Sequence, residues 1–367
     1  MTQHEPVRIG LIGCGVISNA YLSISERFPI LKFVACADIV PEAAKRTADK
    51  FGLVHMTTDE LLARDDIEVV LNLTVPGAHG EVNLAALETG KHAFCEKPFG
   101  LDVEEGESIL RRAADLNLRL GCAPDTFLGG GHQTARHLID EGAIGKPLSG
   151  TAFMMGHGHE SWHPAPEFYY KPGGGPLFDM GPYYITALVN ALGPVKRVAA
   201  ITSRGFEQRT ITSKPKNGEV IEVEVDTHTS GVLEFHNGAV VTVVMSFDVW
   251  RHSNRFIEIH GAERSMTCPD PNGFGGRVGI SGSGREWEDQ TLSHANLENS
   301  RSIGLADMCM GIRTGRAHRA SGELAFHVLE VMDAFGKSSV EGQHIEMRSR
   351  PDRPAALPVG LDDSVLD

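Results

Sequence analysis

Short continuous apolar runs alternate with helix-like stretches through the first third of this chain. The runs predict strands at 7–13, 31–38, 67–74, 91–96 and 118–122. Helical patterns separate them at 17–28, 41–52, 79–89 and 103–116. Strands that are apolar on both faces are typical of a parallel sheet covered by helices on either side. The first third is therefore predicted to be a doubly wound, parallel-sheet α/β domain.

After residue 123 the pattern changes to one-residue alternation. Polar and apolar side chains alternate strictly in 220–226 (VIEVEVD), and Asn237-Gly238 joins the two apolar runs of 231–247 as a hairpin. Helical spacing returns at 322–335. Alternation indicates strands with one covered and one open face. The second domain is therefore predicted to be α+β, with a large, mostly antiparallel open sheet.

Length and composition limit the possible classes of protein. The 367 residues exceed the roughly 250–300 at which one core stops growing, so we expect domains at 1–123 and 124–346, with an irregular tail at 347–367. A net charge of −14 argues against nucleic acid as a partner. No run approaches the roughly 18 apolar residues of a membrane helix, and the N-terminus lacks a signal-peptide pattern. We expect a cytoplasmic protein without a membrane partner, whose six cysteines are small buried residues.

A glycine-rich turn joins the first predicted strand to the first helix. Gly13 permits the tight turn, Gly15 lets a pyrophosphate approach bare backbone, and the helix beginning at Val16 and Ile17 supplies free N–H groups. Asp38 ends the second strand, where a carboxylate accepts from ribose hydroxyls and repels a 2′-phosphate. A turn without a ligand, or an Asp38 that merely begins a helix, is the alternative. The context favours a Rossmann domain that binds NAD rather than NADP.

Polar residues also follow the next two strands. Thr74, Pro76 and His79 follow the strand at 67–74, and a Glu-Lys-Pro motif begins at Glu96 and Lys97. Ligands of open α/β sheets bind at the carboxyl ends of the strands. Such a tripeptide alone is more often a surface turn, but its place at the mouth of the predicted crevice favours contact with the cofactor.

The second domain carries an acid and a phenol at helical spacing. Asp179 and Tyr183 lie four residues apart and so share one face of a helical turn, although Asp179 is also suited to capping the helix. Four of the five tyrosines lie within residues 169–184, near Trp162. Aromatic side chains with polar tips suit the faces and hydroxyls of a sugar ring, and packing between domains explains them nearly as well.

Three histidines, His157, His159 and His163, lie in the segment HGHESWH. Imidazoles at this spacing can converge on zinc, or they can line a pocket from alternate positions of a strand. We favour the pocket and predict no metal. The other candidates for contacting a substrate are Asp125, Trp162, Tyr184, Trp250 and His252.

Together these motifs resemble the Gfo/Idh/MocA family, NAD(P)-dependent dehydrogenases of sugars, cyclic polyols and related compounds. The resemblance rests on GCGVIS, the P-x-x-H segment, GKHAFCEKPFG, IDEGAIGKP and GGG-x-x-x-DMG, in order from the N-terminus to beyond residue 190. It implies that Lys97 is catalytic, that the bond before the next proline is cis, and that Asp179 and a histidine four residues later complete the site. Tyr183 occupies that histidine position here, as in some members.

The chemistry needs a group that takes a proton. Oxidation of a secondary alcohol removes a hydride from carbon and a proton from oxygen, and lysine, with a pKa of about 10.4, is a poor base. We expect desolvation and the charged nicotinamide to lower the pKa of Lys97. Tyr183 can act where a neighbouring ammonium favours its phenolate. We hypothesise that Lys97 and Tyr183 form a proton-transfer pair oriented by Asp179, with His163 as a substitute for the missing histidine.

The sequence thus favours an NAD-dependent dehydrogenase acting on a secondary hydroxyl of a sugar, glycoside or cyclitol. The alternatives are a glycosidase or eliminase that oxidises its sugar transiently with bound NAD, and a non-catalytic NAD-sensing protein. The alternating residues of 220–226 and 231–235 leave one sheet face without a covering helix. We therefore expect a homodimer or homotetramer formed through that face.

Overall fold

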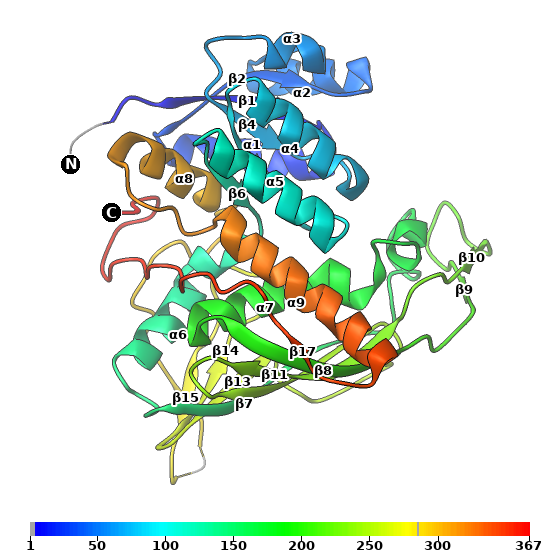
Figure 1. The fold of residues 1–367 in the computed structure, drawn as a ribbon, viewed down its shortest axis with the longest axis vertical. Helices are drawn as coiled ribbons and strands as arrows, with labels where there is room; N and C mark the ends of the chain where they lie inside the picture. Colours follow the sequence, from blue (N-terminus) through cyan, green and yellow to red (C-terminus); the bar gives the residue numbers. More distant parts are fainter. Residues whose placement is uncertain (1–3, 285) are drawn as a thin grey trace.

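A computed structural model describes residues 4–284 and 286–367, and within them two large sheets lie on opposite sides of a layer of helices (Figure 1). The first sheet has six strands in the order β3-β2-β1-β4-β5-β6, all parallel. Its strands are β1 (Val7–Ile12), β2 (Leu31–Ala37), β3 (Val54–Met56), β4 (Val69–Asn72), β5 (His92–Cys95) and β6 (Leu120–Cys122). This sheet and its helices, here the first domain, confirm the predicted Rossmann topology.

The helices of the first domain cover both faces of its sheet. They are α1 (Val16–Leu22), α2 (Pro41–Phe51), α3 (Thr58–Leu62), α4 (His79–Glu88) and α5 (Val103–Asp115). All four residues of β4 are buried, as the continuous apolar run requires. The helix predicted at 17–28 is shorter, because α1 ends at Leu22, whose carbonyl oxygen accepts from the Ser25 hydroxyl.

The second sheet has nine strands among the described residues, in the order β16-β15-β14-β13-β7-β12-β11-β8-β17. The bounds are β7 (Pro147–Met155), β8 (Val195–Ser203), β11 (His228–Phe235), β12 (Val240–Ser246), β13 (Ile257–Gly261), β14 (Ser265–Cys268), β15 (Gly279–Ser281), β16 (Glu288–Asp289) and β17 (Ile345–Glu346). Only the β12–β7 pair is parallel, which confirms a mostly antiparallel sheet. The β11–β12 hairpin turns at Gly238, as predicted.

The remaining helices of eight or more residues are α6 (Gly130–Asp140), α7 (Gly175–Leu192), α8 (Ile303–Thr314) and α9 (Gly322–Glu341), of which α8 packs on β6 of the first domain. Helix α9 packs on α7 and β8 and also on α5 and β6, so it joins the two domains (Figure 1). In residues 4–284 and 286–367, no helix combines the length and apolar character that crossing a membrane requires.

One predicted strand belongs elsewhere. In 220–226 only β10 (Val220–Glu222) forms, and it pairs with β9 (Gln208–Thr210) in a separate two-stranded ribbon rather than in the large sheet. The alternation there is explained by a second small core, in which Ile221 and Val223 pack with Tyr170. The prediction that 220–226 belongs to the open sheet is therefore wrong.

Candidate active site

Lys97 and Asp179 connect the two domains. Lys97 follows β5, and its Nζ donates to the backbone oxygen of Asp179 at 2.6 Å and to Oδ1 at 3.0 Å. Asp179 lies inside α7, whose N-cap is Gly174, so the capping alternative is excluded. Both side chains are 17% exposed, so this ion pair is largely shielded from water.

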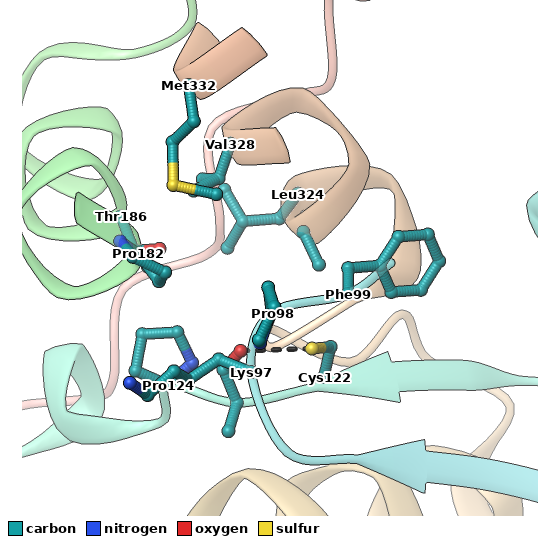
Figure 2. Close-up of a pocket in the computed structure, with 12 residues that line it drawn as sticks. Lys97, Pro98, Phe99, Cys122, Pro124, Pro182, Thr186, Leu324, Val328 and Met332 are labelled. Atoms are coloured by element: carbon teal, nitrogen blue, oxygen red, sulfur yellow. Dashed lines mark hydrogen bonds between the residues drawn. The ribbon is translucent and has the colours of Figure 1, made fainter. Parts of the chain in front are cut away.

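The loop that carries Lys97 rests on α9. The Lys97–Pro98 peptide bond is cis, in agreement with the resemblance. Figure 2 shows Leu324 and Val328 of α9 beside Pro98, in a small pocket that Lys97 and residues of α7 also line. Packing of residues 97–99 against α9 fixes the backbone from which Lys97 reaches Asp179.

The pKa of Lys97 was expected to be lowered, but the protein's own charged groups raise it. Burial lowers the pKa of Lys97, but Asp179, Tyr183 and Glu96 outweigh burial and raise it above its ordinary value. Burial likewise raises the pKa of Asp179, and Lys97 and His159 outweigh it and lower that pKa. The pair is therefore an ammonium and a carboxylate at neutral pH.

Tyr183 lies beneath Lys97, as predicted, but the contact is to its ring. The ammonium is 5.2 Å from the ring centroid, and the phenol is only 6% exposed. Its hydroxyl oxygen instead lies 3.4 Å from Nη1 of Arg301, a residue that sequence reasoning missed. Arg301 stands between two serines outside any recognisable motif, so no local pattern could have identified it.

Glu96 is the carboxylate next to Arg301. Its Oε1 accepts from the Tyr21 hydroxyl at 2.8 Å and lies 3.8 Å from Nη1 of Arg301. Glu96 and Arg301 are both largely buried. We call the five residues Glu96, Lys97, Asp179, Tyr183 and Arg301 the Tyr183 cluster. Two cations and two carboxylates thus surround one phenol.

Among the three histidines, His159 reaches Asp179. Its Nε2 lies 3.5 Å from Oδ2 of Asp179, and its ring stacks on Tyr169 with centroids 3.7 Å apart. His163 instead accepts at Nδ1 from the backbone N–H of Ala165. Of these histidines, His159 is therefore the one whose ring pairs with Asp179.

The remaining substrate candidates divide between the surface and the core. His157 stacks on the exposed Trp250, whose neighbour His252 faces the backbone oxygen of Met155. Trp162 is 62% exposed and lies beside His159. In the described part of the chain, no group of three His, Cys, Asp or Glu side chains is arranged to hold a metal ion.

Asp125 and Tyr184, predicted to contact a substrate, are both buried in the structure. Asp125 is fully buried, and its Oδ2 accepts from the backbone N–H groups of Ser302 and Gly304 at the start of α8. Tyr184 is 1% exposed and donates to the backbone oxygen of Phe153. Both side chains bond to the backbone, and their burial argues against contact with a substrate.

The predicted phosphate-binding segment, which we call the glycine turn (residues 13–18), follows β1. Gly13 has φ +99°, and a Cβ there would lie 2.5 Å from the backbone of Leu73. A Cβ at Gly15 would meet no atom within 4 Å, so its backbone is open to a ligand. Val16 is 93% exposed and Ile17 is half-buried beside it. The turn therefore offers bare backbone, as pyrophosphate binding requires.

Asp38 lies next to the glycine turn at the end of β2. Its Oδ2 accepts from the N–H of Cys14 at 2.7 Å and its Oδ1 from that of Val40 at 2.8 Å. Arg46 of α2 lines a neighbouring cavity of about 330 Å³ that Gly15 also lines. A carboxylate so placed fits the ribose of NAD.

Thr74, Pro76 and His79 follow β4 on the same side of the sheet. The Thr74 hydroxyl donates to Asn72, and Pro76 begins a short 3-10 helix, Pro76–Ala78. His79 is 1% exposed, and its ring nitrogens face the backbone oxygens of Pro98 and Thr74. The prediction that His79 contacts the cofactor is therefore corrected: its ring braces the loops after β4 and β5.

Comparisons with known proteins agree with this geometry. Residues 7–123 match the family model described as "Oxidoreductase family, NAD-binding Rossmann fold", and residues 132–267 match "GFO/IDH/MocA C-terminal domain". Levoglucosan dehydrogenase of Pseudarthrobacter phenanthrenivorans is 29% identical over 291 residues, covering 71% of this chain and 73% of that protein. An inositol 2-dehydrogenase/D-chiro-inositol 3-dehydrogenase of Lactiplantibacillus plantarum is 30% identical over 159 residues, 40% of this chain and 44% of that protein.

Solved structures share the fold over nearly the whole chain. A levoglucosan dehydrogenase in complex with NADH and L-sorbose superposes with a TM-score of 0.78 at 23% identity, covering 94% of this chain and 99% of that one. An aldose–aldose oxidoreductase from Caulobacter crescentus gives a TM-score of 0.78 at 20% identity, covering 94% and 100%. The arrangement of the two domains is therefore common to several oxidoreductases.

Proposed function

The chain belongs to the Gfo/Idh/MocA family of NAD-binding oxidoreductases, and on that premise we propose that it transfers a hydride between a secondary hydroxyl of a sugar, glycoside or cyclitol and NAD. The observation that carries the proposal is the contact of Lys97 with Asp179 above Tyr183. Relatives named for levoglucosan and inositol support the class of substrate.

Each residue of the Tyr183 cluster has a separate role in the proposed reaction. NAD, when bound, supplies the carbon that accepts the hydride. Lys97 holds three N–H donors, of which Asp179 engages two, so one is free to donate to the reacting oxygen. Tyr183 exchanges the proton with that oxygen, since a raised pKa keeps Lys97 protonated at neutral pH. Asp179 orients the ammonium, and His159 holds the other carboxylate oxygen.

Gly13, Gly15, Val16, Ile17 and Asp38 would hold the dinucleotide. The backbone of the glycine turn would bind the pyrophosphate, and the carboxylate would accept from the ribose hydroxyls. Thr74, Pro76 and Glu96 follow the neighbouring strands at the same edge of the sheet, on the path toward Lys97. His157 and Trp162 would contact the hydroxyls and ring faces of a sugar.

A substrate screen tests the proposed function. Sugars, glycosides and cyclitols are offered with NAD and with NADP, and cofactor reduction is measured. We expect Lys97→Met to lower kcat/KM about 10²- to 10³-fold, as loss of one donor to a developing charge does. Lys32→Met is the matched control, because Lys32 is exposed at the amino end of β2, the opposite sheet edge.

The same screen separates the proposal from its rivals. Near-normal turnover by Lys97→Met, with NAD still tightly bound, would contradict the role given to Lys97. Cleavage of an aryl glycoside without net NADH would indicate the glycosidase or eliminase instead.

We also propose a homodimer or homotetramer formed through the open face of the large sheet. Ile201, Val232 and Val240 of this face are exposed by 74%, 40% and 43%. They belong to neighbouring strands β8, β11 and β12, and helices α7 and α9 pack on the other face. A monomer whose sedimentation is independent of concentration would contradict this assembly.

A further inference from the structure

Arg301 is a buried cation whose neighbours are a phenol and a carboxylate. Its side chain is 13% exposed, and Nη1 lies 3.4 Å from the Tyr183 hydroxyl oxygen and 3.8 Å from Oε1 of Glu96. Burial lowers the pKa of Arg301, but Tyr183, Glu96 and Asp125 outweigh it, so the guanidinium stays charged. A buried charge of this kind is costly unless its partners are held in place.

Hydrogen bonds hold the backbone next to Arg301 in place. Ser302 has φ +103°, a conformation that residues with a side chain rarely adopt. The N–H of Ser302 donates to Asp125 at 3.1 Å, and so does that of Gly304, while the Ser302 hydroxyl donates to the backbone oxygen of Tyr21. Strained backbone persists where its surroundings over-determine it, and such positions gather at functional sites.

Hydrogen-bond chemistry decides what Arg301 does to Tyr183. A guanidinium only donates, so the hydroxyl oxygen of Tyr183 accepts in this contact. The phenol's own proton is then free to be donated elsewhere. Glu96, which accepts from Tyr21, lies near the same Nη1 of Arg301 and balances its charge.

The charged and titratable groups around Tyr183 come from four segments. Lys97 lies over the ring from the loop after β5, Asp179 precedes Tyr183 by one turn of α7, and Arg301 approaches the hydroxyl from the segment before α8. Tyr169, from the 3-10 helix Pro166–Tyr170, is a further neighbour, and Glu96, from the same loop as Lys97, adjoins Arg301. Asp179 binds the lysine, and among the described residues Arg301 is the cation that donates to the Tyr183 hydroxyl oxygen.

We propose that Arg301 is a positioning residue that stabilises the phenolate of Tyr183 during proton transfer, an inference that rests on the proposed function. In the oxidation, the proton of the substrate hydroxyl passes to the phenolate oxygen as the hydride leaves the carbon. In the reduction, the phenol gives its proton to the new hydroxyl oxygen, and Arg301 faces the resulting negative charge. A tyrosine can thereby do the work of the histidine usual in this family.

The pH profile of the oxidation provides the first test. Arg301→Met should lower kcat about 10- to 100-fold, the usual effect of removing a hydrogen bond to a charged group. The acid limb of kcat/KM should move to higher pH, because the phenolate forms less readily without the cation. Arg301→Lys should restore part of both, and NAD affinity should be unchanged.

Arg313→Met is the matched control. Arg313 lies on the adjoining α8 and forms a two-point ion pair with Glu68, at 2.7 and 2.8 Å, beyond the reach of Tyr183. Its loss should leave the pH profile unmoved. Equal profiles for Arg301→Met and the parent would overturn the proposal and leave Arg301 as an ion-pair partner only.

A second measurement needs no turnover. The ultraviolet absorbance of tyrosinate is titrated in the parent, Tyr183→Phe, Arg301→Met and Arg301→Lys, all with NAD bound and with folding checked by circular dichroism. The parent minus Tyr183→Phe isolates one phenol, and we expect Arg301→Met to move that signal to higher pH. An unmoved signal refutes the inference even if the dehydrogenase is active. Where no alcohol reduces NAD, the proposed function fails and this titration still decides the role of Arg301.

Discussion

The glycine turn exposes backbone at the proposed cofactor site, whereas the Tyr183 cluster consists of buried side chains held by ion pairs. Residues 13–18 need only two local conditions, a positive φ at Gly13 and open space at Gly15. The cluster depends on contacts between residues far apart in the chain, such as Lys97 with Asp179 and Tyr183 with Arg301. Binding of the cofactor and transfer of the proton should therefore fail independently of each other.

The largest effect should come from Tyr183→Phe. The ring under Lys97 remains, but the hydroxyl beside Arg301 is lost. We expect kcat to fall about 10²- to 10⁴-fold, the contribution usual for a general acid or base, with NAD affinity unchanged. Steady-state kinetics and a fluorescence titration with NADH measure the two quantities. A parallel loss of cofactor affinity would break the proposed independence.

Two glycine substitutions test the glycine turn. Gly13→Ala combines a positive φ with a Cβ 2.5 Å from the Leu73 backbone, and we expect the free energy of unfolding to fall by about 2–4 kcal/mol. Gly15→Ala meets no atom, so its stability should change by less than about 0.5 kcal/mol. Its methyl group would still obstruct a pyrophosphate.

Denaturant unfolding and NAD titration of both variants are therefore informative together. Both should bind NAD more weakly, and only Gly13→Ala should lose stability. Undiminished NAD affinity in Gly15→Ala would contradict the placement of the pyrophosphate against residues 13–18.

This difference also explains what the sequence revealed. Gly13, Gly15 and Asp38 lie in one strand–turn–helix–strand segment, and their spacing alone predicts their neighbourhood. Lys97 and Asp179 were predicted from separate motifs, and the ion pair between them agrees with that prediction. Arg301 was missed because its position depends on Asp125, 176 residues earlier, and on the backbone at Ser302.

The errors in the predicted fold have a similar origin. The six-stranded sheet could be predicted from the continuous apolar runs, because a strand buried on both faces needs apolar residues at every position. Alternation in 220–226 indicates one buried face but does not say which core buries it. That core proved to be the small one around Tyr170 and Phe247, not the large sheet. His79 was assigned to the cofactor from its place after the strand at 67–74, and that place does not reveal that both ring nitrogens face backbone oxygens.

Cofactor preference should respond to Asp38 more modestly. Asp38→Asn keeps an acceptor for the N–H of Cys14 or Val40 and removes the charge that repels a 2′-phosphate. We expect the ratio of kcat/KM for NADP to that for NAD to rise about 5- to 10-fold, the order set by ~1 kcal/mol of Coulomb repulsion at about 4 Å in water. Asp59→Asn, an exposed acid on α3, is the control. An unchanged ratio would remove Asp38 from the ribose site.

The smallest effect should be a pH dependence of stability that belongs to the Lys97–Asp179 pair alone. The lowered pKa of Asp179 contributes stability above its unfolded value, about 3.9, and this is lost as pH falls through the folded value. The raised pKa of Lys97 contributes stability below its unfolded value, about 10.4, and this is lost as pH rises through the folded value.

The parent minus Asp179→Asn difference in unfolding free energy should therefore be level between those limits and decline on both sides. Asp49→Asn offers the comparison with an exposed pair, Lys45–Asp49, whose charges are screened by solvent. Its difference curve should be nearly flat throughout. If the two curves matched, the Lys97–Asp179 pair would be no better shielded than a surface contact. The Tyr183 cluster would then lack the buried charges on which the proposed proton transfer depends.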